Sequence, residues 1–293
     1  MKRHVIVGLG EILWDVFPDG PRFGGAPSNF ACSAAELAGG RAEVCLVSAV
    51  GDDELGRRAI EALSTHGVNT SAVQWADQPT GQVQVELDPA GVASYRFAQD
   101  TAWDNLVWNR TVQQMAETCD AVCFGTLGQR SAESRRVIQQ FVRATPAAAL
   151  RILDVNLRSP FFDDSVILES LELANFLKLN DNELSRLAGM CAAEGTDIEQ
   201  LRQIANRFQL HGIALTRGAD GAILICGPEE SDLPGQPAEV ADTVGAGDAF
   251  TAAMTLGLLA NTPVKQINQH AIAVAAWVCT QKGATPAFPS SML

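Results

Sequence analysis

The chain has 293 residues, enough for one large α/β domain or two smaller ones with a substantial buried core. Hydrophobic residues make up 47% and charged residues 19% of the sequence, a balance typical of soluble globular proteins, and no apolar stretch is long enough to span a membrane. With 21 basic and 34 acidic residues the net charge is −13, which argues against nucleic acids and anionic membranes as partners but allows a local positive pocket.

The seven cysteines are scattered, form no Cys-x-x-Cys pair and lie mostly in apolar runs, such as residues 44–47 and 121–124. We interpret them as buried thiols that stay reduced, which predicts a cytoplasmic location. Residues 2–4 are basic and precede an apolar run, but Glu11 and Asp15 interrupt that run before it reaches the length of a signal peptide.

Short apolar runs rich in β-branched residues alternate with amphipathic helical segments along most of the chain. Strands are predicted at residues 5–9, 44–49, 121–124, 150–155, 176–179, 212–216 and 222–226. This alternation predicts a mostly parallel sheet with helices on both faces. In such sheets, ligands bind beyond the carboxyl ends of the strands.

A glycine-rich segment, Phe23-Gly24-Gly25-Ala26-Pro27-Ser28-Asn29, follows the first predicted strand and precedes a helix of small residues. Its glycines let the backbone approach a ligand closely, and the Asn29 amide offers a hydrogen-bond donor and an acceptor. Taken alone, the segment is also compatible with a turn and helix cap. Leu13 stands where a dinucleotide-binding fingerprint after Gly8 and Gly10 needs a glycine, and the sequence contains no P-loop.

One segment departs from the strand–helix alternation. Residues 83–87 and 92–97 read as two strands with alternating side chains, joined by the turn-forming sequence Asp88-Pro89-Ala90-Gly91. Because a hairpin has exposed edges, we expect further strands beside it.

Polar segments follow three of the predicted strands, at residues 154–158, 180–183 and 216–221, so they are expected to meet at one crevice. Each has a structural alternative. Arg158 could form a salt bridge, Asn180 and Glu183 have the spacing of a helix capping box, and residues 216–221 could be a simple hairpin turn.

Near the C-terminus, residues 242–250 read Asp-Thr-Val-Gly-Ala-Gly-Asp-Ala-Phe and lead into an apolar helix. The small residues Gly245, Ala246 and Gly247 let backbone N–H groups face one concavity at the helix N-terminus, which favours an anion such as phosphate. A carboxylate beside that anion, Asp248, suits a base for a neutral hydroxyl, so the segment indicates phosphoryl transfer to an alcohol. The structural alternative is a tight turn with Asp248 as a helix N-cap.

Together these segments resemble, in the same order and along nearly the whole chain, the signatures of the ribokinase-like sugar kinases, also called the phosphofructokinase B family. The resemblance implies a three-layer α/β/α fold and a single kinase domain over residues 1–293. It also implies a small β-sheet lid, built from segments at about 12–26 and 80–105, that pairs two subunits in a homodimer. Gly-Gly-Ala-Pro before Asn29 is most similar to the fructokinase branch, whereas ribokinases carry a lysine in that loop.

The resemblance implies ATP and Mg²⁺ as cofactors, and it also suggests a bound potassium ion. Its implied sugar-binding residues are Asp15, Gly24, Gly25, Asn29, Arg96 and Arg158. Its implied nucleotide-binding residues are Asn180, Thr216, Gly218, Gly221 and Gly283. Glu183 would help hold Mg²⁺ through water, Asp242 would belong to the potassium loop, and Asp248 would be the base beside the anion hole of residues 245–247.

We therefore expect ATP-dependent phosphorylation of a sugar hydroxyl, with D-fructose and its 6-hydroxyl as the first candidate. Other acceptors remain open: 2-keto-3-deoxygluconate, ribose or a nucleoside, and Arg96 could serve the carboxylate of a sugar acid. A non-catalytic sugar-binding regulator is the alternative from another class of protein, which the intact Asp248 and anion loop argue against.

Overall fold

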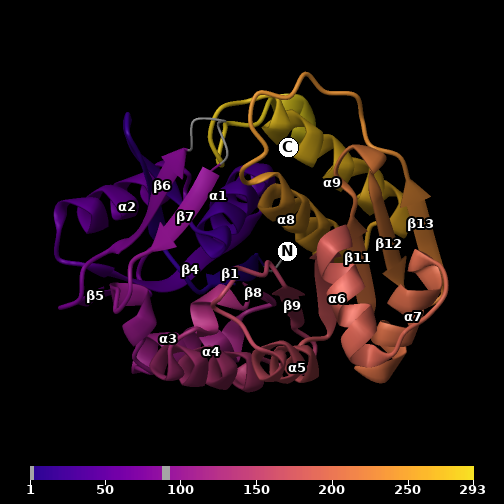
Figure 1. The fold of residues 1–293 in the computed structure, drawn as a ribbon, viewed down its shortest axis with the longest axis horizontal. Coiled ribbons are helices and arrows are strands. Elements are labelled where there is room, and N and C mark those ends of the chain that lie inside the picture. The colour runs from indigo at the N-terminus through magenta and orange to yellow at the C-terminus, as the bar shows by residue number, and fades with distance from the viewer. Residues whose placement is uncertain (1–2, 88–92) are drawn as a thin grey trace.

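A computed structural model describes residues 3–87 and 93–293, and its main element is a nine-stranded sheet (Figure 1). The strand order is β13-β12-β11-β10-β9-β8-β1-β4-β5. The strands are β1 (His4–Leu9), β4 (Ala42–Gly51), β5 (Val73–Ala76), β8 (Ala121–Phe124), β9 (Leu150–Asp154), β10 (Phe176–Asn180), β11 (Gly212–Thr216), β12 (Ala222–Cys226) and β13 (Glu229–Leu233). All pairs from β5 to β11 are parallel, while β12 and β13 are antiparallel.

The predicted mostly parallel sheet is confirmed, and all seven predicted strands are found. Two edge strands were not predicted. β5 has only four residues and ends the sheet with a half-exposed Trp75. β13 reads Glu-Glu-Ser-Asp-Leu, because an edge strand that is open to water on one side needs no apolar run.

Helices cover both faces of this sheet in two layers. One layer comprises α1 (Ala26–Ala38), α2 (Glu54–Thr65), α8 (Ala246–Leu259) and α9 (Val264–Cys279). The other comprises α3 (Arg110–Thr118), α4 (Ala132–Ala144), α5 (Asp164–Leu173), α6 (Asp181–Cys191) and α7 (Asp197–Arg207). Along β1, Ile6 packs into the first layer and Val7 into the second, which is why the central strands are apolar on both faces. Figure 1 shows α3, α4 and α5 in a row below the middle strands and α8 and α9 above them.

A separate four-stranded sheet has the order β3-β2-β6-β7. It consists of β2 (Leu13–Phe17), β3 (Gly20–Gly24), β6 (Gly81–Leu87) and β7 (Ala93–Phe97). The predicted hairpin is therefore found, with β2 and β3 beside it. The predicted turn at Asp88-Pro89-Ala90-Gly91 and the first residue of the predicted second strand, Val92, lie outside the described residues.

Short 3₁₀ helices complete the chain: η1 (Ala102–Asn105), η2 (Leu127–Gln129), η3 (Gly218–Asp220) and η4 (Ser290–Met292). A small apolar cluster of Leu13, Val83, Trp103 and Leu127 joins the four-stranded sheet to η1 and η2. Within the described ranges, no helix is both long and apolar enough to cross a membrane.

Candidate active site

A cleft of about 690 Å³ opens between the four-stranded sheet and the carboxyl ends of the central strands. Nine of the residues proposed from the sequence line it: Asp15, Gly25, Asn29, Arg158, Asn180, Thr216, Gly245, Gly247 and Asp248. They come from β2, the start of α1, the ends of β10 and β11, the loop after β9 and the start of α8. The parallel sheet therefore brings residues together that lie more than 200 positions apart in the sequence.

Asp248 lies in the first turn of α8, but it is not the N-cap, because that position belongs to Gly245. Its Oδ2 atom accepts a hydrogen bond of 2.8 Å from Nδ2 of Asn29. Burial, and next the Asp154 carboxylate, raise the pKa of Asp248 to about 6, although Asn29, Lys178 and Arg158 oppose the shift. A carboxylate with this pKa is ionised at neutral pH and is more basic than an ordinary aspartate, as a general base requires.

The side-chain amide of Asn29 has a second polar atom, Oδ1, besides the Nδ2 that binds Asp248. Its Oδ1 is buried and has no hydrogen-bond partner among the described residues. Because a buried acceptor without a partner costs free energy, a ligand hydroxyl that donates to Oδ1 would be favoured. Asn29 thus links the carboxylate of Asp248 to the space that a substrate hydroxyl would occupy.

The turn before α8 is shaped by its glycines. Gly245 has φ = 81°, and a Cβ there would lie 2.2 Å from the carbonyl oxygen of Ala284, so only glycine fits. The first turn of a helix leaves backbone N–H groups without intrahelical partners, and here those groups and the positive end of the helix dipole border the cleft. The turn can therefore bind an anion beside Asp248.

Lys178 lines the cleft on β10 and was not identified from the sequence. Its side chain is buried, with Nζ 3.1 Å from Oδ1 of Asp154, and a Cβ on Gly247 would lie 3.0 Å from Nζ. Burial alone would lower the pKa of Lys178, but the carboxylates of Asp154, Glu183 and Asp248 outweigh it and raise this pKa. The ammonium group is therefore charged and lies next to the anion-binding turn. Its only signal in the sequence was a lone lysine inside an apolar strand.

The predicted strand end at residues 154–158 divides into two parts. Asp154 is buried, its Oδ2 accepts from Oγ1 of Thr251 at 3.0 Å, and its Oδ1 accepts from Nζ of Lys178 at 3.1 Å. Arg158 lies beyond the strand, is exposed and lines the cleft, and it donates a long hydrogen bond, 3.5 Å, to the Leu157 carbonyl. The alternative of a salt bridge for Arg158 finds no support in the described part of the chain.

Asn180 and Glu183 form the capping box that their spacing allows. Oδ1 of Asn180 accepts from the Glu183 N–H at 3.0 Å, and Oε2 of Glu183 accepts from the Asn180 N–H at 2.8 Å. Oε1 of Glu183 also accepts from the Leu157 N–H at 2.9 Å. The structural interpretation is thus realised, while each carboxylate oxygen keeps a lone pair for a water molecule.

Residues 20–291 match the model of the pfkB family carbohydrate kinases. The chain belongs to this family. A fructokinase of Vibrio alginolyticus is 29% identical, with 96% of this chain and 94% of that protein covered.

Solved structures agree with the three-layer fold of this pfkB-family kinase. A sugar kinase of Pyrococcus horikoshii in complex with ATP has a TM-score of 0.82 at 26% identity, covering 98% of this chain and 96% of that chain. A fructokinase of Xylella fastidiosa with bound ATP has a TM-score of 0.83 at 24% identity, covering 97% and 95%. The predicted fold is therefore confirmed.

Asp242 connects two loops of the kinase. Its Oδ1 accepts from the Val244 N–H at 3.1 Å and its Oδ2 from the Gly283 N–H at 3.2 Å. Among residues 3–87 and 93–293, no group of three or more His, Cys, Asp or Glu side chains is placed to hold a metal ion. Asp242 and Glu183 are thus not parts of one carboxylate cage.

Several residues proposed from the sequence lie outside the lining of the cleft: Gly24, Arg96, Gly218, Gly221, Glu183, Asp242, Ala246 and Gly283. A Cβ on Gly24 would lie 3.0 Å from Oδ2 of Asp15, so this glycine makes room for the Asp15 carboxylate. Gly218 and Gly221 form the turn between β11 and β12, so the hairpin-turn interpretation also holds. On β7, Tyr95 and Phe97 line the cleft, and Arg96 lies between them on an alternating strand.

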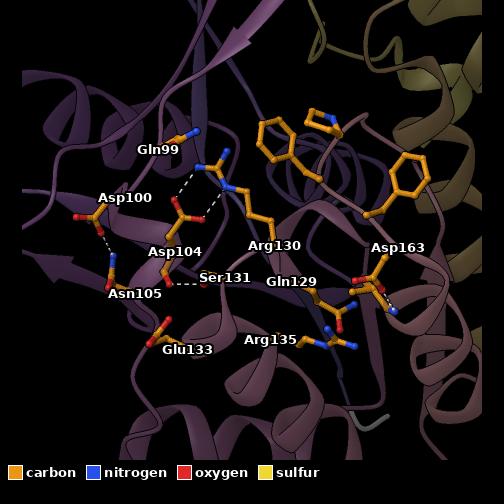
Figure 2. Close-up of a pocket in the computed structure, with 14 residues that line it drawn as sticks. Gln99, Asp100, Asp104, Asn105, Gln129, Arg130, Ser131, Glu133, Arg135 and Asp163 are labelled. Carbon is orange, nitrogen blue, oxygen red and sulfur yellow. Dashed lines mark hydrogen bonds and ion pairs between the residues drawn. The ribbon is translucent and has the colours of Figure 1, made fainter.

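A second hollow, of about 560 Å³, lies beside the start of α4 and shows how the four-stranded sheet is held (Figure 2). In Figure 2 the guanidinium of Arg130 faces the carboxylate of Asp104, and both side chains are buried. Nε and Nη2 of Arg130 bind Oδ1 and Oδ2 of Asp104 at 2.7 and 2.6 Å, and Nη2 also donates to the Ala98 carbonyl at 2.6 Å. The guanidinium lies 4.0 Å from the ring centre of Trp103. This pair therefore ties the end of β7 to η1 and α4.

We expect Arg130→Met to lower the free energy of unfolding by about 3–5 kcal/mol, because it leaves the Asp104 carboxylate buried without its counterion. Urea unfolding followed by circular dichroism measures this change. The matched control is Arg135→Met, which removes a more exposed ion pair between Arg135 and Glu169 and should cost less than about 1 kcal/mol. Equal effects of the two substitutions would contradict the structural role of Arg130.

Proposed function

We propose that this pfkB-family kinase transfers the γ-phosphoryl group of ATP to the 6-hydroxyl of D-fructose. The observation that carries the proposal is the position of Asp248, which is held by Asn29 at the edge of an anion-binding turn inside the cleft. A base for a hydroxyl and a site for the phosphoryl group thus border the same space, as an in-line transfer requires. The fructokinase of Vibrio alginolyticus supports fructose as the acceptor.

In the proposed reaction, the carboxylate of Asp248 takes the proton of the sugar hydroxyl as its oxygen attacks the γ-phosphorus. Backbone N–H groups of Gly245 and Gly247 and the Lys178 ammonium stabilise the charge on the transferring group, while the Ala246 N–H donates to the Thr243 carbonyl within the turn. Asp15 and Oδ1 of Asn29 accept hydrogen bonds from sugar hydroxyls, and burial raises the pKa of Asp15 while Arg158 and Arg22 oppose this. Arg158 borders the space of the transferred group.

ATP is proposed to extend from the anion-binding turn toward the ends of β10 and β11, where Asn180 and Thr216 line the cleft. The ATP complex of the Pyrococcus horikoshii sugar kinase supports this nucleotide. Bound Mg²⁺ would neutralise phosphate charge. Glu183 would hold it through a water molecule, which fits an ion that keeps most of its waters and has few direct protein ligands. Asp242, which joins the loops of Val244 and Gly283, is proposed to border a potassium ion.

The four-stranded sheet is proposed to be a lid inserted into a single kinase domain, since it covers the cleft through Asp15, Val83 and Phe97. We also propose a cytoplasmic homodimer in which two lids meet. β3 and β7 are the outer strands of this sheet, and edge strands are suited to pairing.

We expect fructose to exceed ribose, adenosine and 2-keto-3-deoxygluconate in kcat/KM by about 10-fold or more. The physical reason is that Ala26 and Pro27 bring no cation to the glycine-rich loop, so selection depends on hydroxyl geometry at Asp15 and Asn29. ADP release in the presence of each acceptor measures the preference, and phosphorus NMR identifies the 6-phosphate. If the enzyme instead prefers 2-keto-3-deoxygluconate and this preference disappears in Arg96→Ala, the acceptor is a sugar acid and the proposal of fructose is wrong.

A further inference from the structure

Glu11 is a buried carboxylic acid at the cleft with no part in the reaction described above. It follows β1, is 3% exposed, and lines the cleft together with Asp248. Its Oε2 is buried and has no hydrogen-bond partner among the described residues. A buried carboxyl oxygen without a partner needs a proton, a water molecule or a ligand group nearby.

A small cavity of about 10 Å³ supplies the place for such a water molecule. Glu11 and Asp248 both line it, together with Asp154, Asn156 and Thr126. This volume corresponds to about one water molecule, and the polar lining offers the two to four partners that a buried water needs. Because Glu11, Asn156 and Asp248 also line the cleft, the cavity adjoins the reaction space.

The groups around Glu11 come from several elements. The Asp248 carboxylate on α8 and the Arg158 guanidinium in the loop after β9 act on it electrostatically, while the backbone N–H of Ala26 lies at the start of α1. Asp154 at the end of β9 and the thiol of Cys123 on β8 share the cavity, and a Cβ on Gly128 in η2 would lie 3.3 Å from Oε2.

Burial, and next the Asp248 carboxylate, raise the pKa of Glu11 to about 7. The backbone N–H groups of Glu11 and Ala26 and the Arg158 guanidinium act in the opposite direction. Glu11 can thus gain and lose a proton near neutral pH. Such a group is suited to pass a proton onward.

We propose that Glu11 is a positioning residue that acts through Asp248, receiving by way of one water molecule in the cavity the proton that Asp248 takes from the sugar. This inference rests on the proposed role of Asp248 as the base. Glu11 and Asp248 line both the cleft and the cavity, so a water molecule in the cavity would connect the two carboxyl groups.

The sugar oxygen forms a bond to the γ-phosphorus, the bond from that phosphorus to the bridging oxygen breaks, and its electron pair leaves with ADP. The hydroxyl proton moves to the Asp248 carboxylate. Asp248 then gives a proton to the water, the water gives one of its protons to the ionised Glu11, and Glu11 releases it to solvent when the products leave.

The test compares Glu11→Gln, Glu11→Asp and the control Glu43→Gln. Glu43 is partly buried near the start of β4, where its Oε1 accepts from Nδ2 of Asn69, away from the carboxyl ends of the strands. For each, kcat and KM for fructose are measured between about pH 5 and pH 9, and kcat is measured in mixtures of H₂O and D₂O.

We expect Glu11→Gln to lower kcat by about 10-fold or more with KM nearly unchanged. In the wild type, kcat should rise with pH through two ionisations. Its dependence on the D₂O fraction should be curved, because the transfer from Asp248 through the water to Glu11 moves two protons together in the step that limits kcat. In Glu11→Gln the pH profile of kcat should show one ionisation, and the dependence of kcat on the D₂O fraction should be linear. Glu11→Asp should recover part of kcat, and Glu43→Gln should match the wild type.

A wild-type pH profile and wild-type isotope dependence in Glu11→Gln would overturn the relay, as would a loss confined to KM. If Glu11→Gln fails to fold, Glu11→Asp decides: an unchanged kcat and unchanged pH profile would overturn the proposal. An active Asp248→Asn would instead refute the base itself. An inactive Asp248→Asn together with an unaffected Glu11→Gln would refute only the relay.

Discussion

Asp248→Asn should lower kcat by about 100-fold or more while the affinities for sugar and ATP stay nearly unchanged. The amide has the same shape as the carboxylate and can still accept the hydrogen bond from Nδ2 of Asn29, so the cleft keeps its geometry. It cannot accept the hydroxyl proton. Steady-state rates and calorimetric binding separate the two effects, since a lost transition-state interaction lowers kcat without raising the dissociation constants.

The matched control for this substitution is Asp197→Asn, which makes the same change in the first turn of α7 at an exposed position. It should leave kcat unchanged. The wild-type enzyme should also lose kcat/KM below about pH 6, because burial and the Asp154 carboxylate raise the pKa of Asp248 to about that value and only the ionised form is a base. Near-normal turnover in Asp248→Asn would refute the assignment.

The sequence predicted the central sheet well because its strands are buried on both faces and therefore appear as short apolar runs. It predicted the turn at residues 245–247 for a related reason, since a conformation such as the φ of 81° at Gly245 excludes most other residues. β13 escaped prediction because a charged edge strand has no apolar pattern. A local sequence pattern thus predicts an element when the element's surroundings in the fold follow from its own amino-acid composition.

Glu11 and Lys178 escaped prediction because their significance depends on residues that are distant in the sequence. Lys178 lies directly opposite Asp154 only because β9 and β10 pair in that register, and no local signal sets the register between two parallel strands. Glu11 reads as an interruption of an apolar run until the fold places it beside Asp248. The capping box of Asn180 and Glu183, in contrast, depends on residues three positions apart, and the sequence was sufficient to suggest it.

Lys178→Met should lower kcat by about 100- to 1,000-fold, the range expected when one group that stabilises charge on the transferring phosphoryl is removed. The Lys178 ammonium borders the anion-binding turn at Gly247, and without it the buried Asp154 carboxylate would repel the phosphates. The same substitution should destabilise the protein by about 3–5 kcal/mol, because one charge of a buried pair is left without its partner. Activity alone would therefore not separate an electrostatic role from a structural one.

The double substitution Lys178→Met with Asp154→Asn separates these roles. It removes both charges, and the amide oxygen can still accept a hydrogen bond from Oγ1 of Thr251, which lies 3.0 Å from Oδ2 of Asp154 and 2.9 Å from the Gly247 carbonyl oxygen. Urea unfolding should show that most of the lost stability returns, since a buried ion pair can be replaced by uncharged groups at little cost. Steady-state kinetics should show that kcat stays low, because the positive charge beside Gly247 is still missing. Recovery of kcat together with stability would show instead that Lys178 only neutralises Asp154.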